Sequence, residues 1–134
     1  MSSDTPSDEA GSADLGGRYL LEFMDESGVV DIDRLATAFR MTKSQLAETT
    51  GLSITTISKA DRKESRRAQM RIIEMLEVLN RIRGWAGGEL QAMAWYRSQP
   101  IPALDGRTSE ALVKSGKSGA LRDYLDHLAL GGFA

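Results

Sequence analysis

Short hydroxyl side chains precede a run of long cationic ones in the stretch from Ser53 to Arg66. Proteins use lysine, arginine and hydroxyl side chains to hold DNA phosphates, and a few such side chains also reach base edges. The chemistry that this stretch indicates is therefore nucleic-acid binding. The candidate DNA-binding residues are Ser53, Thr55, Thr56, Ser58, Lys59, Arg62, Lys63 and Arg66.

Groups that carry catalysis or bind metals are scarce. The chain has 134 residues, no cysteine and one histidine, His127. Thiolate chemistry and disulfides are thereby excluded, and no histidine cluster is left for zinc. The sequence Gly116-Lys117-Ser118 is similar to the end of a phosphate-binding loop, but Ala111 stands where that motif needs a glycine. We therefore predict no catalytic residue, no metal and no cofactor, and the protein is not expected to be an enzyme.

Positive charge is concentrated in the middle of the chain. Residues 1–33 carry nine acidic side chains and one basic one, whereas residues 34–83 carry eleven basic and five acidic ones. Residues 84–134 carry five of each, so a net charge of −2 hides a basic centre. This distribution is typical of a DNA-binding module, although a solvated helix face gives the same count.

The periodicity of the apolar residues predicts an all-α fold. A helix follows a cap at Asp31 or Asp33 and carries Leu35 and Phe39, and Thr42 caps the next one. Further helices are predicted at 43–50, 54–61, 67–83, 89–98 and 120–130, with a short one between Thr108 and Gly116.

Glycines and prolines are expected to separate these helices. Gly84 and the Gly87-Gly88 pair interrupt the pattern after the long helix. Pro100 and Pro102 stop the following helix and force an extended crossing, and Asp105-Gly106 is a turn signal.

The segment from Lys43 to Lys59 meets the packing requirements of two helices that cross steeply around a tight turn. Ala47 supplies the small residue of the first helix, and Gly51 supplies the turn four residues later. The apolar contacts between the helices are assigned to Leu46, Leu52, Ile57 and Ala60. This pattern resembles the lambda-repressor-like, or Xre-type, helix-turn-helix, whose second helix enters the major groove of DNA. The alternative is a helical hairpin that packs and never touches DNA.

The C-terminal half carries a second pattern, which extends from Trp95 to the last residue. Its elements are Trp95, Pro100, Pro102, Leu104, Gly106, Thr108, Leu112, Gly116 and the closing Gly131-Gly132-Phe133-Ala134. Together with the first pattern it resembles the Xre/MbcA/ParS family of antitoxins over about residues 33–134. The chain departs from the family at Ser109, where a proline is common.

The resemblance implies a partner and a mechanism. Such antitoxins neutralise a toxin of the RES-domain or ParT type, which consumes or transfers from NAD, by covering its active site, often with their C-terminal end. The toxin contacts that the resemblance assigns are Trp95, Arg107, Gly131, Gly132, Phe133 and Ala134. A glycine pair that bends the chain, an apolar anchor and a terminal carboxylate suit such a contact. The alternative is a terminus that folds back on the core.

The predicted organisation follows from these patterns. Residues 1–14 form a disordered acidic tail, 15–67 an Xre-like helix-turn-helix domain, 68–84 a connecting or dimerisation helix, and 85–134 the toxin-binding domain. We expect a cytoplasmic homodimer within a toxin–antitoxin complex, which binds operator DNA and no membrane. The alternative function is a stand-alone transcription regulator whose C-terminal part only dimerises or senses a ligand.

Overall fold

The computed structural model describes residues 17–58 and 65–132. Over these residues the fold is helical, as predicted, and the only strand-like pairs are the isolated bridges Met24–Val30 and Ile101–Arg107. The predicted tail at 1–14 and the end of the helix predicted at 54–61 lie outside them. The elements are α2 (Ile32–Phe39), α3 (Lys43–Thr50), α4 (Ile54–Ser58), α6 (Arg66–Ala86), α7 (Glu89–Ser98), the 3₁₀ turn η2 (Pro102–Leu104), α8 (Ser109–Lys114), α9 (Ser118–His127) and the π turn η3 (Leu128–Gly132).

Side-chain caps set where several of these helices begin. Asp31, rather than Asp33, accepts the backbone N–H of Arg34 and starts α2. Thr42 starts α3 with a capping box, in which the Gln45 side chain accepts the N–H of Thr42 in return. Ser65 and Thr108 cap α6 and α8 by accepting the backbone N–H of Ala68 and Ala111.

Helix α6 lies at the centre of the core. Its predicted apolar face is confirmed, since Ile72, Met75, Leu76, Leu79 and Ile82 are all buried. The predicted end of this helix was wrong, because the helix continues through position 84 to residue 86. A glycine inside a helix costs only about 1 kcal/mol, and the left-handed cap of this helix lies at Gly87, whose N–H donates to the Arg83 carbonyl.

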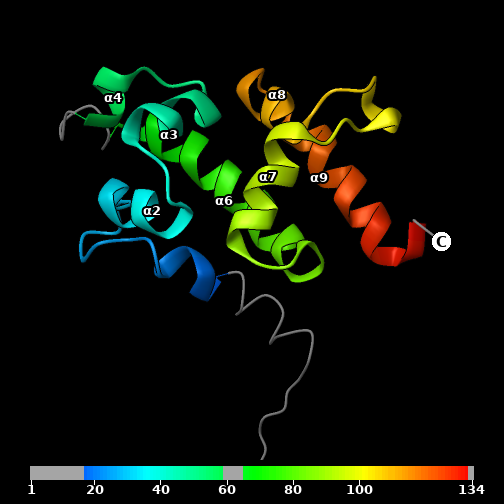
Figure 1. Ribbon diagram of the computed structural model, residues 1–134, viewed down its shortest axis with the longest axis horizontal. Coiled ribbons are helices and arrows are strands. Elements are labelled where there is room, and N and C mark those ends of the chain that lie inside the picture. The colour runs from blue at the N-terminus through cyan, green and yellow to red at the C-terminus, as the bar shows by residue number, and fades with distance from the viewer. Residues whose placement is uncertain (1–16, 59–64, 133–134) are drawn as a thin grey trace, which may run out of the picture.

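The three N-terminal helices and the C-terminal end occupy opposite ends of the long axis (Figure 1). α2, α3 and α4 lie at one end, α9 and the C-terminus lie at the other, and α6 runs between them. Contacts join α6 to α7 and α8, α3 to α8, and α2 to α7. The buried side chains form one continuous cluster that spans the regions predicted as the helix-turn-helix and the toxin-binding domain.

The C-terminal half alternates short helices with tight turns. The predicted turn at Asp105-Gly106 is confirmed, because both residues have left-handed backbone between η2 and α8. The last helix begins at Ser118, two residues earlier than predicted, and changes to a π turn at Leu128. Gly131 ends that turn with a φ of 94°, a conformation that a residue without Cβ adopts at no steric cost.

The segment before α2 is helical over residues 17–21. Tyr19 and Phe23 are buried, and their rings meet edge to face with centroids 5.2 Å apart. Arg83 of α6 stacks over the ring of Tyr19 at 4.3 Å. This segment therefore belongs to the core.

Candidate functional site

Helices α3 and α4 pack through three of the four apolar residues assigned to this contact, and the fourth, Ala60, lies outside the described residues. Leu46, Ala47 and Ile57 are buried, and Leu52 is partly buried against the same cluster. Gly51 has a φ of 74°, and a Cβ at this position would lie 3.0 Å from the Cγ atom of Lys114. The turn therefore needs glycine for its backbone conformation and for the close approach of α8.

The outer face of α4 is open and polar. Ser53, Thr55 and Ser58 are exposed, whereas Thr56 is partly buried. The hydroxyl of Ser53 accepts the N–H of Thr56 at 3.0 Å and also pairs with the Thr56 hydroxyl at 2.9 Å, so it serves as a helix cap. Ile54 is 45% exposed on the same short helix. The sequence analysis did not single out this exposed apolar side chain.

The cations predicted for this surface are only partly described. Lys59, Arg62 and Lys63 lie outside the described residues. Arg66 is exposed at the first position of α6, and Arg67 is exposed beside it. The described part of the surface thus combines the face of α4 with the start of α6.

The C-terminal end of α3 is held by side chains from the second half of the chain. The Tyr96 hydroxyl donates to the Thr49 carbonyl at 3.2 Å. Arg71 donates to the carbonyls of Thr50 at 3.4 Å and of Lys114 at 3.1 Å. Helix C-terminal carbonyls need such donors, and here they come from α6 and α7.

A chain of ion pairs joins α3, α7 and α8. Arg97 donates to the Glu110 carboxylate at 2.7 Å and lies 3.3 Å from Glu48, and Lys114 meets Glu110 at 3.1 Å. The Glu110 side chain is 11% exposed. Its hydrogen bond raises the pKa of the Arg97 guanidinium, while burial opposes the shift. This group links the two predicted domains through charge.

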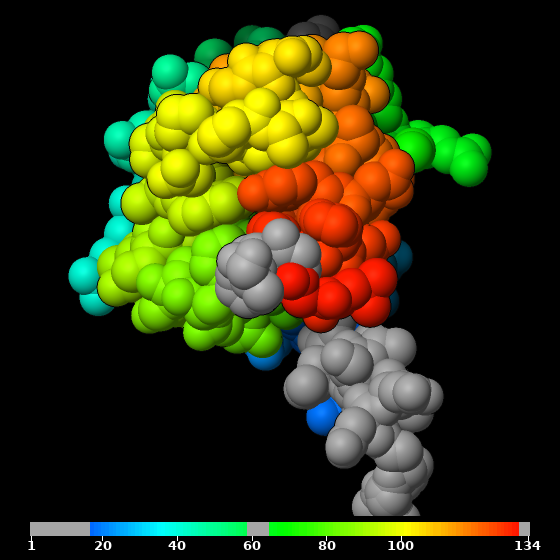
Figure 2. All heavy atoms as spheres, turned by 90° about the vertical axis from the view of Figure 1, so that its right-hand side faces the viewer, coloured from blue at the N-terminus to red at the C-terminus, as the bar shows by residue number. Residues whose placement is uncertain are grey.

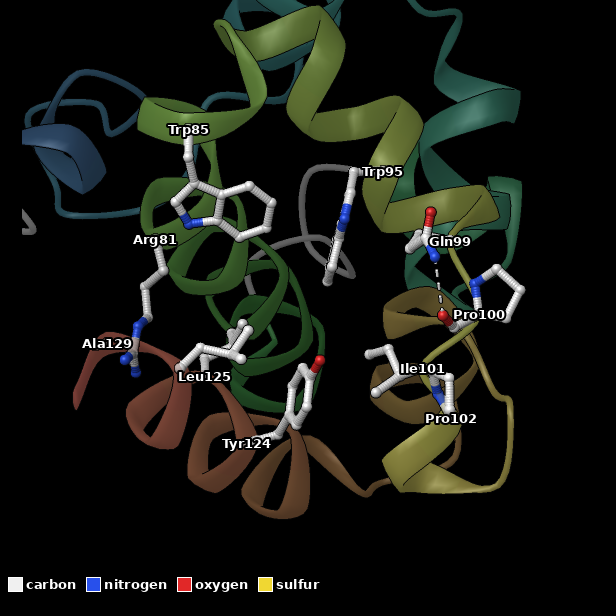
Figure 3. A pocket seen from close by; sticks show the side chains of 11 residues that line it. Arg81, Trp85, Trp95, Gln99, Pro100, Ile101, Pro102, Tyr124, Leu125 and Ala129 are labelled. Carbon is white, nitrogen blue, oxygen red and sulfur yellow. Dashed lines mark hydrogen bonds between the residues drawn. The ribbon is translucent and has the colours of Figure 1, made fainter. Parts of the chain in front are cut away.

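A pocket of about 470 Å³ opens at the opposite end of the molecule. Figure 3 shows the rings of Trp85 and Trp95 on one side of it, with Tyr124 and Leu125 of α9 facing the segment that contains the prolines. The two indole rings meet edge to face with centroids 5.3 Å apart, and Trp85 is 54% exposed. The lining residues are Arg81, Trp85, Trp95, Gln99, Pro100, Ile101, Pro102, Tyr124, Leu125, Leu128 and Ala129. A mostly apolar hollow with a few polar groups is typical of a binding site.

Ion pairs between α6 and α9 position one wall of this pocket. Arg81 meets Asp126 at 2.7 Å, and Arg122 lies 3.9 Å from Glu77. Arg81 therefore reaches a carboxylate of α9. Within α6 itself, Arg71 lies 3.7 Å from Glu74.

The predicted toxin contacts lie in different places. Trp95 lines the pocket, and Gly131 and Gly132 close the π turn that begins with two lining residues. Arg107 is not among the lining residues, and its buried Nε atom has no hydrogen-bond partner in the described part of the chain. Phe133 and Ala134 lie outside the described residues.

Sequence reasoning missed most of the pocket, although one signal was present. Trp85 follows Ile82 by three residues, so it continues the apolar spacing of α6 beyond Gly84. Tyr124 is one position from the apolar residue Leu125 and gives no such signal.

Metal sites and membrane-spanning helices were sought in residues 17–58 and 65–132. These residues hold no cluster of three or more metal-ligating side chains, and none of their helices combines the length and apolarity required to cross a bilayer. Comparisons of the chain with protein-family models, with curated proteins and with solved structures found no match.

Proposed function

We propose that the protein is the antitoxin of a type II toxin–antitoxin pair, which neutralises an NAD-consuming toxin of the RES-domain or ParT type and represses its own operon. The observation that carries the proposal is the presence of two separate candidate surfaces on one core. Helix α4 lies at one end of the long axis, and α9, which lines the aromatic pocket, lies at the other (Figure 1). One chain then has room for DNA and a partner protein at once.

The DNA-binding part of the proposal treats α3, Gly51 and α4 as a helix-turn-helix. Its support is the buried contact of Leu46, Ala47 and Ile57 beneath an outer face of hydroxyl groups, with Arg66 and Arg67 beside it. In a helix-turn-helix the second helix lies in the major groove, and a two-fold dimer reads two half-sites. We expect the operator to be a pseudo-palindrome.

The toxin-binding part of the proposal uses the other end of the molecule. An exposed tryptophan at the rim of an apolar pocket is the kind of anchor that dominates protein interfaces. The C-terminal segment after Gly131 starts beside this pocket, and the family resemblance assigns it to the toxin active site. We propose that the pocket holds the toxin surface while the last residues occupy the catalytic cleft.

Co-expression with the product of the adjacent gene tests the toxin-binding part. The proposal predicts a complex that co-purifies, rescues growth and preserves cellular NAD. Deletion of residues 132–134 restores toxicity, and Trp85→Ala weakens the complex at least about tenfold. Leu21→Ala is the matched control, because Leu21 is 66% exposed and does not line the pocket. Absence of a complex, or an equal effect of both substitutions, contradicts this part.

Binding to the DNA upstream of the gene tests the other part. Thr55→Asp places a negative charge on the exposed face of α4 and should abolish binding, whereas Thr37→Asp on the exposed face of α2 should not. Equal affinities for the two variants contradict a role for α4. Specific DNA binding without any toxin complex identifies the alternative, a stand-alone regulator whose pocket senses a ligand.

A further inference from the structure

A cationic groove lies between the start of α6 and the loop that joins α8 to α9. Its volume is about 400 Å³. Figure 2 shows the two segments side by side, α6 in green and the loop in orange. The lining residues are Arg66, Arg67, Met70, Arg71, Glu74 and Gly116.

Three cations at this groove have no ion-pair partner among the described residues: Arg66, Arg67 and the exposed Lys117, which follows the lining residue Gly116. Two acidic side chains near these cations in the described part of the chain are already paired. Glu74 is bonded to Arg71, and Glu110 is bonded to Arg97 and Lys114. The described lining of the groove therefore carries an excess of positive charge, which attracts an anion.

The groove adjoins the turn that leads into α4. Arg71 donates to the carbonyls of Thr50 and Lys114, and it thereby fastens the end of α3 to the end of α8. The Cγ atom of Lys114 lies close to Gly51, the residue of that turn. Arg71 and Lys114 thus connect the turn before α4 with the start of α6 and the end of α8.

We infer that the α8–α9 loop is part of the DNA interface, in which Lys117 and Arg67 hold the phosphate backbone of duplex DNA beside the site read by α4. This inference rests on the DNA-binding part of the proposed function. It adds that the C-terminal half, assigned to the toxin, also contacts DNA. Cations of this kind bind phosphates without regard to sequence and release counterions, so their contribution appears in the salt dependence of binding.

The test measures the affinity of the full chain for a labelled random-sequence duplex of about 30 base pairs by fluorescence anisotropy, at KCl concentrations from about 50 to 200 mM. Lys117→Ala and Arg67→Ala each remove one cation of the groove. Each should make the slope of log K against log salt concentration shallower by about 0.9. The factor by which affinity falls between about 50 and 200 mM KCl should then be about 3.5 times smaller for the variant than for the wild type. Lys117→Arg should keep the wild-type slope.

Arg18→Ala is the matched control. Arg18 is an exposed arginine in the helical turn at 17–21, on the side of the molecule opposite α4 and α8 (Figure 1), and its loss changes the net charge equally. A wild-type slope for this variant, with shallower slopes for both groove variants, supports the inference.

Two negative results have different meanings. If Lys117→Ala keeps the wild-type slope while Arg67→Ala and Thr55→Asp weaken binding, the loop is outside the interface, so the inference is wrong and the proposed DNA binding stands. If the wild-type chain binds no duplex at about 50 mM salt, the proposed DNA binding itself is wrong.

Discussion

The ion pair between Arg97 and Glu110 should contribute more to stability than a surface pair of similar geometry. It joins α7 to α8, and through Glu48 it reaches α3. The Arg97 Nε atom lies 2.7 Å from the carboxylate, and the two side chains are only 30% and 11% exposed. Water therefore screens this pair less than it screens an exposed one.

The magnitude follows from what each substitution leaves behind. Hydrogen bonds to charged groups contribute about 1.5–3 kcal/mol. Glu110→Gln removes the charge that two cations share, and Arg97→Met leaves the carboxylate with Lys114 alone. Each single substitution should lower the free energy of unfolding by about 2 kcal/mol, and the double-mutant cycle should give a coupling energy of about 1.5 kcal/mol.

Urea unfolding followed by far-UV circular dichroism measures these free energies. The control cycle uses Lys43 and Asp33, whose atoms lie 3.0 Å apart but whose side chains are 42% and 74% exposed. That cycle should give at most about 0.5 kcal/mol. If the two coupling energies are equal, burial does not strengthen the Arg97–Glu110 pair, and the reasoning is refuted.

Three other substitutions test single features of the fold by urea unfolding. Tyr96→Phe removes the hydrogen bond to the Thr49 carbonyl and should lower the free energy of unfolding by about 1 kcal/mol at neutral pH. Burial, and secondarily Glu110, raises the pKa of Tyr96 in the folded state. Above the ordinary tyrosine pKa of 10.0, this residue loses its proton in the unfolded chain but keeps it in the folded one, so the free energy of unfolding of the wild type should fall as the pH rises. In the Phe variant, which lacks this proton, the free energy of unfolding should fall by about 1.4 kcal/mol less per pH unit. Gly51→Ala places a side chain on a backbone with a φ of 74° and should lower the free energy of unfolding by about 1–2 kcal/mol. Arg40→Gly removes a side chain from a backbone with a φ of 53° and should raise the free energy of unfolding by up to about 1 kcal/mol.

The helices predicted most accurately have strong local signals at both ends. The bounds of α3 were predicted correctly because Thr42 caps its first turn and Gly51 takes the left-handed position after its last. Those of α7 were correct because Gly87-Gly88 precedes it and Pro100 follows it. Such signals act within a few residues, so a single sequence displays them.

The pocket and the ion-pair chain depend on tertiary contacts that local patterns do not encode. Trp85 and Tyr124 meet at one pocket although they lie on helices far apart in the sequence. Arg81 selects Asp126 of α9 over the acids of its own helix because packing brings that carboxylate to 2.7 Å. The length of α6 was missed because Gly84 was taken as a stop, whereas a glycine inside a helix costs only about 1 kcal/mol and the left-handed cap lies at Gly87.

The contacts at the end of α3 bear on how the two candidate surfaces influence each other. Tyr96, Arg97 and Arg71 connect α3 to the second half of the chain, and Gly51 rests on Lys114. A close-packed core transmits displacement, so a partner that shifts α7 or α8 also shifts the turn before α4. Under the proposed function, any factor by which the toxin changes DNA affinity equals the factor by which DNA changes toxin affinity. The same coupling free energy therefore links the DNA affinity to the toxin affinity. Substitutions in the contacts between α3, α7 and α8 should change this coupling free energy.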